Sequence, residues 1–141
     1  MLQKTESPLR AFILAASLML AGCAGVPAQI CAPGTMPMIQ AQLFFGRDVA
    51  GRAMVSEEEW RRFLDEEVTP RFPGGLSVAD VSGQWRDAGG TIVREESKVL
   101  LILMRGGPED EGRLNAIRDS YKRRFNQDAV LLVELPVCAA F

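Results

Sequence analysis

Histidine is absent from the 141 residues, so the side chain that most often acts as acid or base near neutral pH is missing. Cysteine is scarce at three residues, and no cluster of cysteine and histidine has the spacing of a zinc site. Basic residues do not dominate either, because 16 Lys and Arg stand against 18 Asp and Glu. A nucleic-acid-binding domain is usually strongly basic. We therefore expect no metal, no cofactor and no nucleic-acid partner.

The N-terminal apolar run, AFILAASLML at residues 11–20, is too short for a membrane span, which needs about 20 apolar residues. It follows Lys4 and Arg10 and precedes the small-residue stretch LAGC at residues 20–23. A basic start, a short apolar core and a small-residue cleavage site are typical of a secretory signal peptide. The alternative is an uncleaved membrane anchor with an incidental cysteine.

The stretch LAGC also resembles the lipobox of bacterial lipoproteins. In that family the peptidase cuts before the cysteine, which then carries lipid chains. The resemblance implies a signal peptide over residues 1–22 and lipidation at Cys23. Two or more acyl chains hold a protein stably on a membrane. By resemblance to lipoproteins of Gram-negative bacteria, Ala24 in place of Asp implies an exported protein on the outer membrane, facing the periplasm.

Residues 23–38 contain the Pro- and Gly-rich stretch VPAQICAPGTMP and are predicted to form an N-terminal tether. Apart from Cys23, the chain has two cysteines, Cys31 and Cys138. An exported chain meets an oxidising compartment, which permits a disulfide between them. The alternative is a pair of free thiols.

Hydrophobic periodicity predicts four strands, at residues 39–45, 76–85, 91–104 and 129–138, and two helices, at residues 57–68 and 108–125. Ser56 and Glu59 have capping-box spacing at the start of the first helix, and Pro108 suits the start of the second. The order β-α-β-β-α-β is that of the ferredoxin-like split βαβ fold. We expect one α+β domain over residues 39–141, a four-stranded sheet with both helices on one face.

In this topology the first and third strands are central and the other two form the edges. The position of Pro136 in the fourth strand agrees with this order, because proline is tolerated in edge strands but not in central ones. The fourth strand should then lie beside the first, which brings Cys138 close to Cys31 and favours the disulfide.

Two helices leave the second face of such a sheet open. In the third strand we expect Val93, Val99, Leu101 and Leu103 to face the helices. The alternate residues of this strand would then lie on the open face. They are charged in the first half of the strand, at Arg94, Glu96 and Lys98, and apolar in the second half, at Leu100, Ile102 and Met104. An exposed apolar patch of this kind marks a binding surface. The alternatives are a β-bulge near Ser97 that reverses the parity, and cover by the tether.

The motifs EEEWRRF, VTPRFP, GQWRD and REESKVL resemble a bacterial lipoprotein family known as domain of unknown function 3574. The resemblance extends over roughly residues 39–138. It implies a compact secreted domain, and it implies no activity, cofactor or catalytic residue.

The predicted hairpin GQWRDAGGTIVREESK gathers polar, aromatic and charged side chains on adjacent strands. Trp85 would form a stacking wall, Arg86 or Arg94 would bind a carboxylate, and Glu95 would act as acceptor or base. The full candidate set for a ligand site is Gln84, Trp85, Arg86, Arg94, Glu95 and Lys98. The alternative is ordinary cross-strand pairing of opposite charges on a solvated hairpin.

Two functions are compatible with these patterns. The first is a non-catalytic, membrane-tethered module of the cell envelope that binds a protein, peptide or glycan and forms a homodimer through the open sheet face. The second is a small enzyme without histidine, with a pocket near the GQWRD hairpin and a tuned carboxylate. The missing histidine favours the first.

Overall fold

The structure, a computed structural model, describes residues 30–48, 54–86 and 89–141. Its elements are β1 (Met36–Gly46), α1 (Glu57–Phe63), the π-helical turn η2 (Leu64–Val68), β2 (Ser77–Arg86), β3 (Ile92–Met104), α2 (Pro108–Phe125) and β4 (Leu131–Ala139). The predicted signal peptide and Cys23 lie outside the described residues. No helix in the described part of the chain is both long and apolar enough to cross a membrane.

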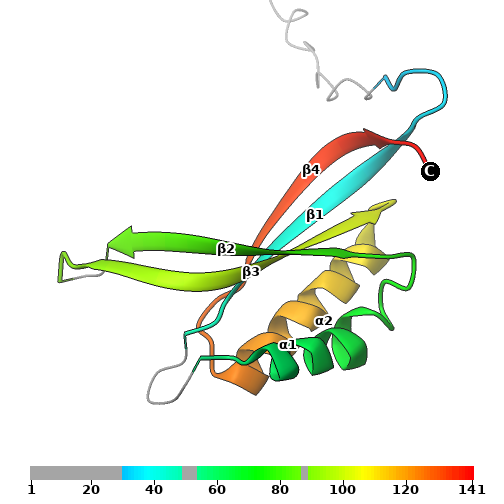
Figure 1. The fold of residues 1–141 in the computed structure, drawn as a ribbon. Helices are drawn as coiled ribbons and strands as arrows, with labels where there is room; N and C mark the ends of the chain where they lie inside the picture. The colour runs from blue at the N-terminus through cyan, green and yellow to red at the C-terminus, as the bar shows by residue number, and fades with distance from the viewer. Residues whose placement is uncertain (1–29, 49–53, 87–88) are drawn as a thin grey trace, which may run out of the picture.

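The four strands form one sheet in the order β2-β3-β1-β4, and every neighbouring pair is antiparallel. Both helices pack against the same face of this sheet (Figure 1). The predicted α+β, ferredoxin-like architecture is therefore confirmed, with β1 and β3 at the centre. Pro136 lies in the edge strand β4, as predicted, where its missing N–H costs no ladder bond on the outer side.

The first helix has the predicted capping box. The Ser56 side chain accepts a hydrogen bond from the Glu59 N–H, and the Glu59 carboxylate accepts one from the Ser56 N–H. These two bonds satisfy donors that the first helical turn leaves free. The last turn is wider than expected, because the Thr69 N–H donates to the Leu64 carbonyl five residues earlier.

The core fills the space between the sheet and the helices. The strands contribute mainly Leu43, Phe45 and Leu100, each fully buried. Helical aromatics meet them, and the rings of Phe45 and Tyr121 lie 4.7 Å apart in an edge-to-face arrangement. Packing of this aromatic layer fixes which face of the sheet is covered.

The strand β1 begins at Met36, so three residues assigned to the predicted tether belong to the sheet. They pair with the end of β4, from Met36 opposite Ala139 to Met38 opposite Val137. The ordered sheet therefore begins three residues earlier than the predicted domain boundary at residue 39.

The predicted faces of β3 are wrong. Leu100, Ile102 and Met104 are buried under the helices, whereas Leu103 is 41% exposed on the open face. Residues paired across a sheet share a face, and β1 places Gln40 opposite Leu103 and Gln42 opposite Leu101. Val93, Val99, Leu101 and Leu103 thus belong to the open face, and Arg94, Glu96 and Lys98 to the helix-side face.

The cause is the length of β3. Its second half is apolar on both faces, so the sequence pattern there does not indicate which residues face the helices. Its first half extends with β2 beyond the helices (Figure 1), so charged residues on the helix-side face of this part remain solvated. The alternative of a bulge near Ser97 is also wrong, because the register with β2 is unbroken from Ile92 to Leu101.

Cys31 and Cys138 are joined by a disulfide, with their Cα atoms 5.6 Å apart. The bond links the segment before β1 to the end of β4, as the predicted topology requires. It closes a loop with a sequence separation of 107 residues, which includes nearly all of the domain.

We predict that replacing both cysteines, Cys31→Ser with Cys138→Ser, lowers the free energy of unfolding by up to about 4.7 kcal/mol, the chain-entropy value for a loop of about 100 residues. The measurement is urea denaturation followed by tryptophan fluorescence. Reduction of the natural chain is the control and should reproduce the loss. Equal stability of the oxidised chain and the double variant would contradict the prediction.

Candidate functional site

The hairpin of β2 and β3 divides the predicted ligand residues between two faces. The register pairs Trp85 with Val93 and Gly83 with Glu95, and both pairs lie on the open face. Successive residues of a strand point to opposite sides. Gln84, Arg86, Arg94 and Lys98 therefore lie on the helix-side face. The structure does not bring the six candidates into one site.

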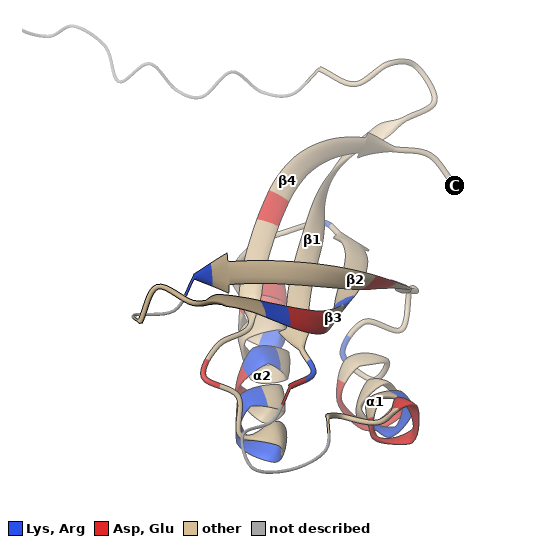
Figure 2. Ribbon diagram, turned by 60° about the vertical axis from the view of Figure 1, so that its left-hand side comes forward, with Lys and Arg blue, Asp and Glu red and all other residues tan. Residues whose placement is uncertain are grey.

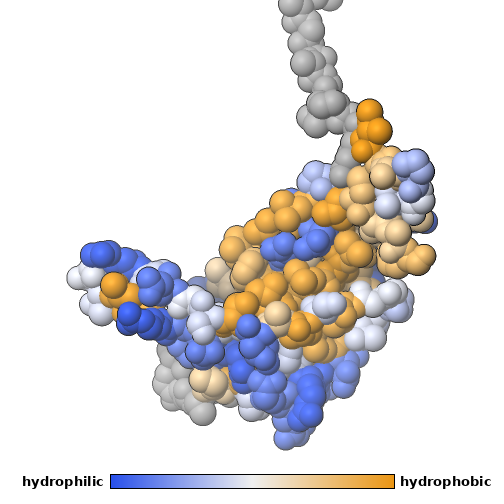
Figure 3. All heavy atoms as spheres, turned by 45° about the horizontal axis from the view of Figure 1, so that its top comes forward, coloured by the Kyte–Doolittle hydropathy of each residue, from blue (hydrophilic) through white to orange (hydrophobic). Residues whose placement is uncertain are grey.

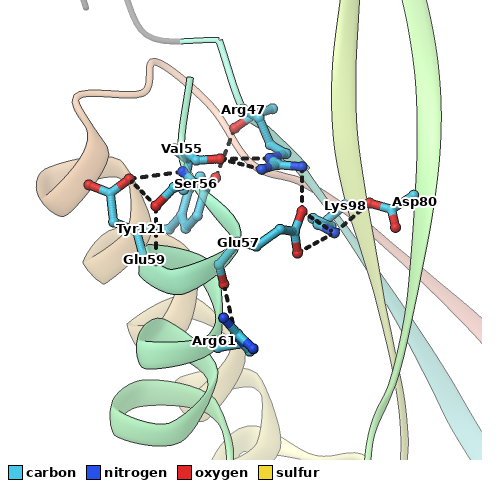
Figure 4. Close-up of polar contacts among 10 residues, drawn as sticks. Arg47, Val55, Ser56, Glu57, Glu59, Arg61, Asp80, Lys98 and Tyr121 are labelled. Atoms are coloured by element: carbon cyan, nitrogen blue, oxygen red, sulfur yellow. Dashed lines mark hydrogen bonds and ion pairs between the residues drawn. The ribbon is translucent and has the colours of Figure 1, made fainter. Parts of the chain in front are cut away.

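Lys98 belongs to an ion-pair network instead (Figure 4). Its side chain is 4% exposed, and its Nζ lies 2.9 Å from Glu57 Oε1 and 2.5 Å from Asp80 Oδ1. Arg47 Nη1 also contacts Glu57, at 2.7 Å, while Arg47 Nε donates to the Val55 carbonyl at 2.8 Å. The network connects the end of β1, the start of α1 and the middle of β2 and β3.

The charges of the network stabilise one another. The hydrogen bond from Lys98 is the main reason that the pKa of Glu57 is lowered. Burial opposes the charge on Lys98, but hydrogen bonds to Asp80 and Glu57 outweigh it, so the pKa of Lys98 is raised. A lysine held in this way acts as a structural cation, because both of its contacts are to carboxylates of the same chain.

Glu95 occupies the most constrained position of the hairpin. A Cβ atom placed on Gly46 would lie 2.0 Å from Glu95 Oε1, so the carboxyl group lies directly over the backbone of the glycine. Burial, together with the charge of Asp48, raises the pKa of Glu95, although a backbone hydrogen bond at Asp48 partly offsets this. Any larger residue at position 46 would displace the Glu95 carboxyl group from this position.

A cavity of about 670 Å³ opens beside Glu95 on the open face. Trp85 and Phe44 supply aromatic walls, and Leu131 closes the side next to β4. This size lies within the usual range for small-molecule sites, about 300–1,000 Å³. Of the predicted ligand residues, the cavity brings together only Trp85 and Glu95.

The rest of the open face is broadly apolar (Figure 3). Leu131 is 58% exposed, and Leu103 and Leu135 are each 41% exposed. The register places these residues on one surface with Gln40 and Gln42 in the middle. The members of the open face around the two glutamines are Met38, Phe44, Ala79, Val99, Leu101, Leu103, Leu131, Val133, Leu135 and Val137.

The sequence analysis missed the contribution of β1 and β4 to this face. The signal was present in MIQAQLFF, where Met38, Gln40, Gln42 and Phe44 share one parity. Ala41, Leu43 and Phe45 form the more continuous apolar set and therefore face the helices. The alternate residues of the same strand must then lie on the uncovered side of the sheet.

Comparison with models of known protein families assigns the chain to one family. The model of a protein family of unknown function, DUF3574, matches residues 40–141. The chain belongs to DUF3574. The family resemblance predicted from the motifs EEEWRRF and GQWRD is thereby confirmed. No curated protein matches the DUF3574 chain in sequence.

Solved structures resemble the DUF3574 chain in fold. A phage SAM lyase in complex with S-methyl-5'-thioadenosine is 15% identical, with a TM-score of 0.56, over 81% of this chain and 95% of that one. The same kind of enzyme in the apo state is 17% identical, with a TM-score of 0.53, over 80% and 95%. CutA1 from Oryza sativa is 15% identical, with a TM-score of 0.50, over 77% and 86%. At this identity the likeness establishes the fold alone.

The described residues contain no group of three or more acidic, cysteine or histidine side chains placed to hold a metal ion. The arrangement offers instead one carboxyl group with a raised pKa beside an aromatic wall, and a large apolar face next to it. Such a surface is suited to binding.

We predict that Glu95→Gln stabilises the DUF3574 chain at pH 7 and has less effect near pH 4. The folded state raises the pKa of Glu95, so it binds this proton more tightly than the unfolded state does. The ionised carboxylate therefore lowers stability as the pH rises through the raised pKa, and glutamine removes that effect.

The measurement is the melting temperature at both pH values. Glu134→Gln is the matched control, because Glu134 is an exposed strand glutamate on the helix-side face. An equal shift at pH 4 and pH 7, or the same pH dependence in the control, would contradict the prediction.

Proposed function

We propose that this DUF3574 chain is a non-catalytic module of the cell envelope, exported and lipid-anchored through Cys23, that self-associates through the open face. The observation that carries the proposal is the uncharged apolar part of the open face around Gln40 and Gln42. Contiguous apolar surface of this extent is costly to leave in water, and on soluble domains it usually marks an interaction site.

The charge distribution favours a second copy of the chain as the occupant. The chain has a formal net charge of −2, so two copies repel each other wherever acidic surfaces meet. The members of the open face around Gln40 and Gln42 carry no charged side chain, and Glu95 lies farther along the same face, on the hairpin. Gln40 and Gln42 carry amides with both donor and acceptor groups, so they can pair with their own copies across a two-fold axis.

The available area suits a small, reversible dimer. β1 and β4 pair over nine positions, while β3 adds Val99–Met104 and β2 adds Ser77–Ala79 beside them. At a strand spacing of about 4.8 Å and a rise of about 3.3 Å per residue, this surface measures roughly 430 Å² per copy. Two copies would bury about 860 Å², slightly below the ~1,000 Å² expected of a stable specific interface. The interface would therefore be small, and its association concentration-dependent.

The alternative of an enzyme without histidine receives less support from the geometry. The register places Arg86 and Arg94 on the opposite face of the hairpin from Trp85, and the hollow that Arg94 shares with Gln84 and Glu95 does not include Trp85 or Arg86. Lys98 is held by Glu57 and Asp80. A catalytic site would have to rely on the neighbouring carboxyl groups of Glu95 and Asp48, which line one cavity, without a histidine or a free lysine beside them.

We predict that residues 24–141 form a dimer in solution at tens of micromolar concentration, and that Leu103→Glu makes them monomeric. The substitution places a charge beside its own copy in an apolar interface, where like charges cost several kcal/mol. Light scattering across a concentration series measures the mass.

Val78→Glu is the matched control. Val78 is 38% exposed, close to the 41% of Leu103, but it lies on the helix-side face of β2. The control should remain dimeric. A natural chain that is monomeric at every concentration, or a Leu103→Glu variant of unchanged mass, would contradict self-association through this face.

The lipid anchor is tested separately. We predict that Cys23→Ala leaves the leader uncleaved and blocks attachment of acyl chains. Metabolic labelling with a palmitate analogue and membrane fractionation of the producing cell provide the measurement. A variant that is processed and labelled like the natural chain would contradict the anchor.

A further inference from the structure

The two chain segments joined by the disulfide carry exposed apolar side chains, and one of them, Phe141, also borders a hollow at the adjoining edge of the open face together with Met38 and Leu103. Ile30 is 95% exposed and Phe141 is 91% exposed, and Met36, at the start of β1, is 43% exposed. The disulfide between Cys31 and Cys138 holds the chain segments of these residues together. We call this group, Ile30, Met36 and Phe141, the disulfide end.

The disulfide end is free of charged side chains. Neither residues 30–46 nor residues 135–141 contain Asp, Glu, Lys or Arg, and the same holds for the whole stretch from residue 11 to residue 46. Figure 2 shows the ends of β1 and β4 near the C label without charged residues, whereas α2 and the hairpin carry many. A surface that enters lipid must avoid charge, because a charged side chain costs several kcal/mol there.

The length of the preceding chain places this end near the membrane. The argument rests on the proposed lipid anchor at Cys23. Seven residues, 24–30, separate Cys23 from Cys31. A chain of this length spans about 28 Å at most when fully extended. Because Cys31 is fixed to β4 by the disulfide, the anchored domain must keep its disulfide end within that distance of the bilayer.

We propose that the disulfide end docks on the lipid bilayer, with Ile30, Met36 and Phe141 entering the interfacial region. A short tether keeps the local concentration of these side chains at the surface high, so even a weak apolar contact is populated. An aromatic ring and aliphatic chains are the groups that bind at the boundary of headgroups and acyl chains. The ligand is the lipid surface that already holds the anchor.

The docking fixes the orientation of the domain. The end of β2 and the start of β3 lie far from the paired ends of β1 and β4 where the disulfide is (Figure 1). With the disulfide end on the membrane, the strands rise from the surface and the hairpin projects into the aqueous compartment. The open face then stands sideways, accessible to a second copy anchored in the same membrane.

A tryptophan reporter tests the docking. The chain is Phe141→Trp in a Trp85→Phe background, lipidated at Cys23 and reconstituted in phosphatidylcholine–phosphatidylglycerol vesicles that contain brominated acyl chains. Trp60 is buried in the core and supplies a constant background. We expect a blue shift of the reporter emission that appears only with vesicles, and quenching by the brominated lipid.

The control reporter is Ile92→Trp in the same background, because Ile92 is 47% exposed at the opposite end of β3. Its quenching should be at least two-fold weaker. Met36→Ser should reduce quenching of the Phe141→Trp reporter, while Met54→Ser, which changes a methionine of equal 43% exposure close to the start of α1, should not.

The outcomes separate docking from anchoring. A chain that floats with the vesicles but is quenched equally at both reporter positions overturns the docking and leaves the anchor intact. A blue shift already present without vesicles shows that a second copy covers this end, which also overturns the docking. A chain that does not float contradicts the anchor itself, and the docking that rests on it fails too.

Discussion

Two helices can cover only one face of a four-stranded sheet, and the rest of this molecule follows from that constraint. The covered face is chosen by the aromatic layer, in which Phe45 of β1 packs edge-to-face with Trp60 and Tyr121. Tyr121 also donates to the Gly46 carbonyl at 2.9 Å, which secures the end of β1 to α2. Every residue of opposite parity in the four strands is therefore directed to the uncovered side.

At the boundary of the covered region the packing changes from apolar to ionic. Leu100 is fully buried under the helices, and Lys98, two residues earlier on the same face, meets the start of α1. A buried lysine without partners would be strongly destabilising. Glu57 and Asp80 satisfy it from two other elements, and both carboxylates remain partly solvated, which limits the desolvation cost. The network therefore marks where the core ends and the projecting hairpin begins.

Much of the fold could be predicted from the sequence because its signals are local. The Ser56–Glu59 capping box, Pro108 at the start of α2 and Pro136 in an edge strand each have one physical explanation. The pairing of Cys31 with Cys138 followed from strand order. The side of β3 that faces the helices could not be predicted in the same way, because every residue from Val99 to Met104 is apolar.

The candidate site was predicted less well for a related reason. Its six residues are close in sequence, but a strand alternates its side chains, so only a register can tell which of them meet. The Glu95 carboxyl group packs over Gly46, which is 49 positions away in the sequence, so the local sequence around Glu95 could not predict that contact.

The two proposed surfaces reinforce each other physically. An anchored domain that docks by its disulfide end loses rotational freedom, and all copies then present the open face at the same height above the membrane. Confinement to a plane raises the effective concentration of one copy around another without any new contact. An interface near the lower limit of stable size, as the footprint of the open face indicates, then needs less intrinsic affinity to form. Gln40 and Gln42 would supply its specificity, because unpaired amides inside an apolar contact penalise any other register.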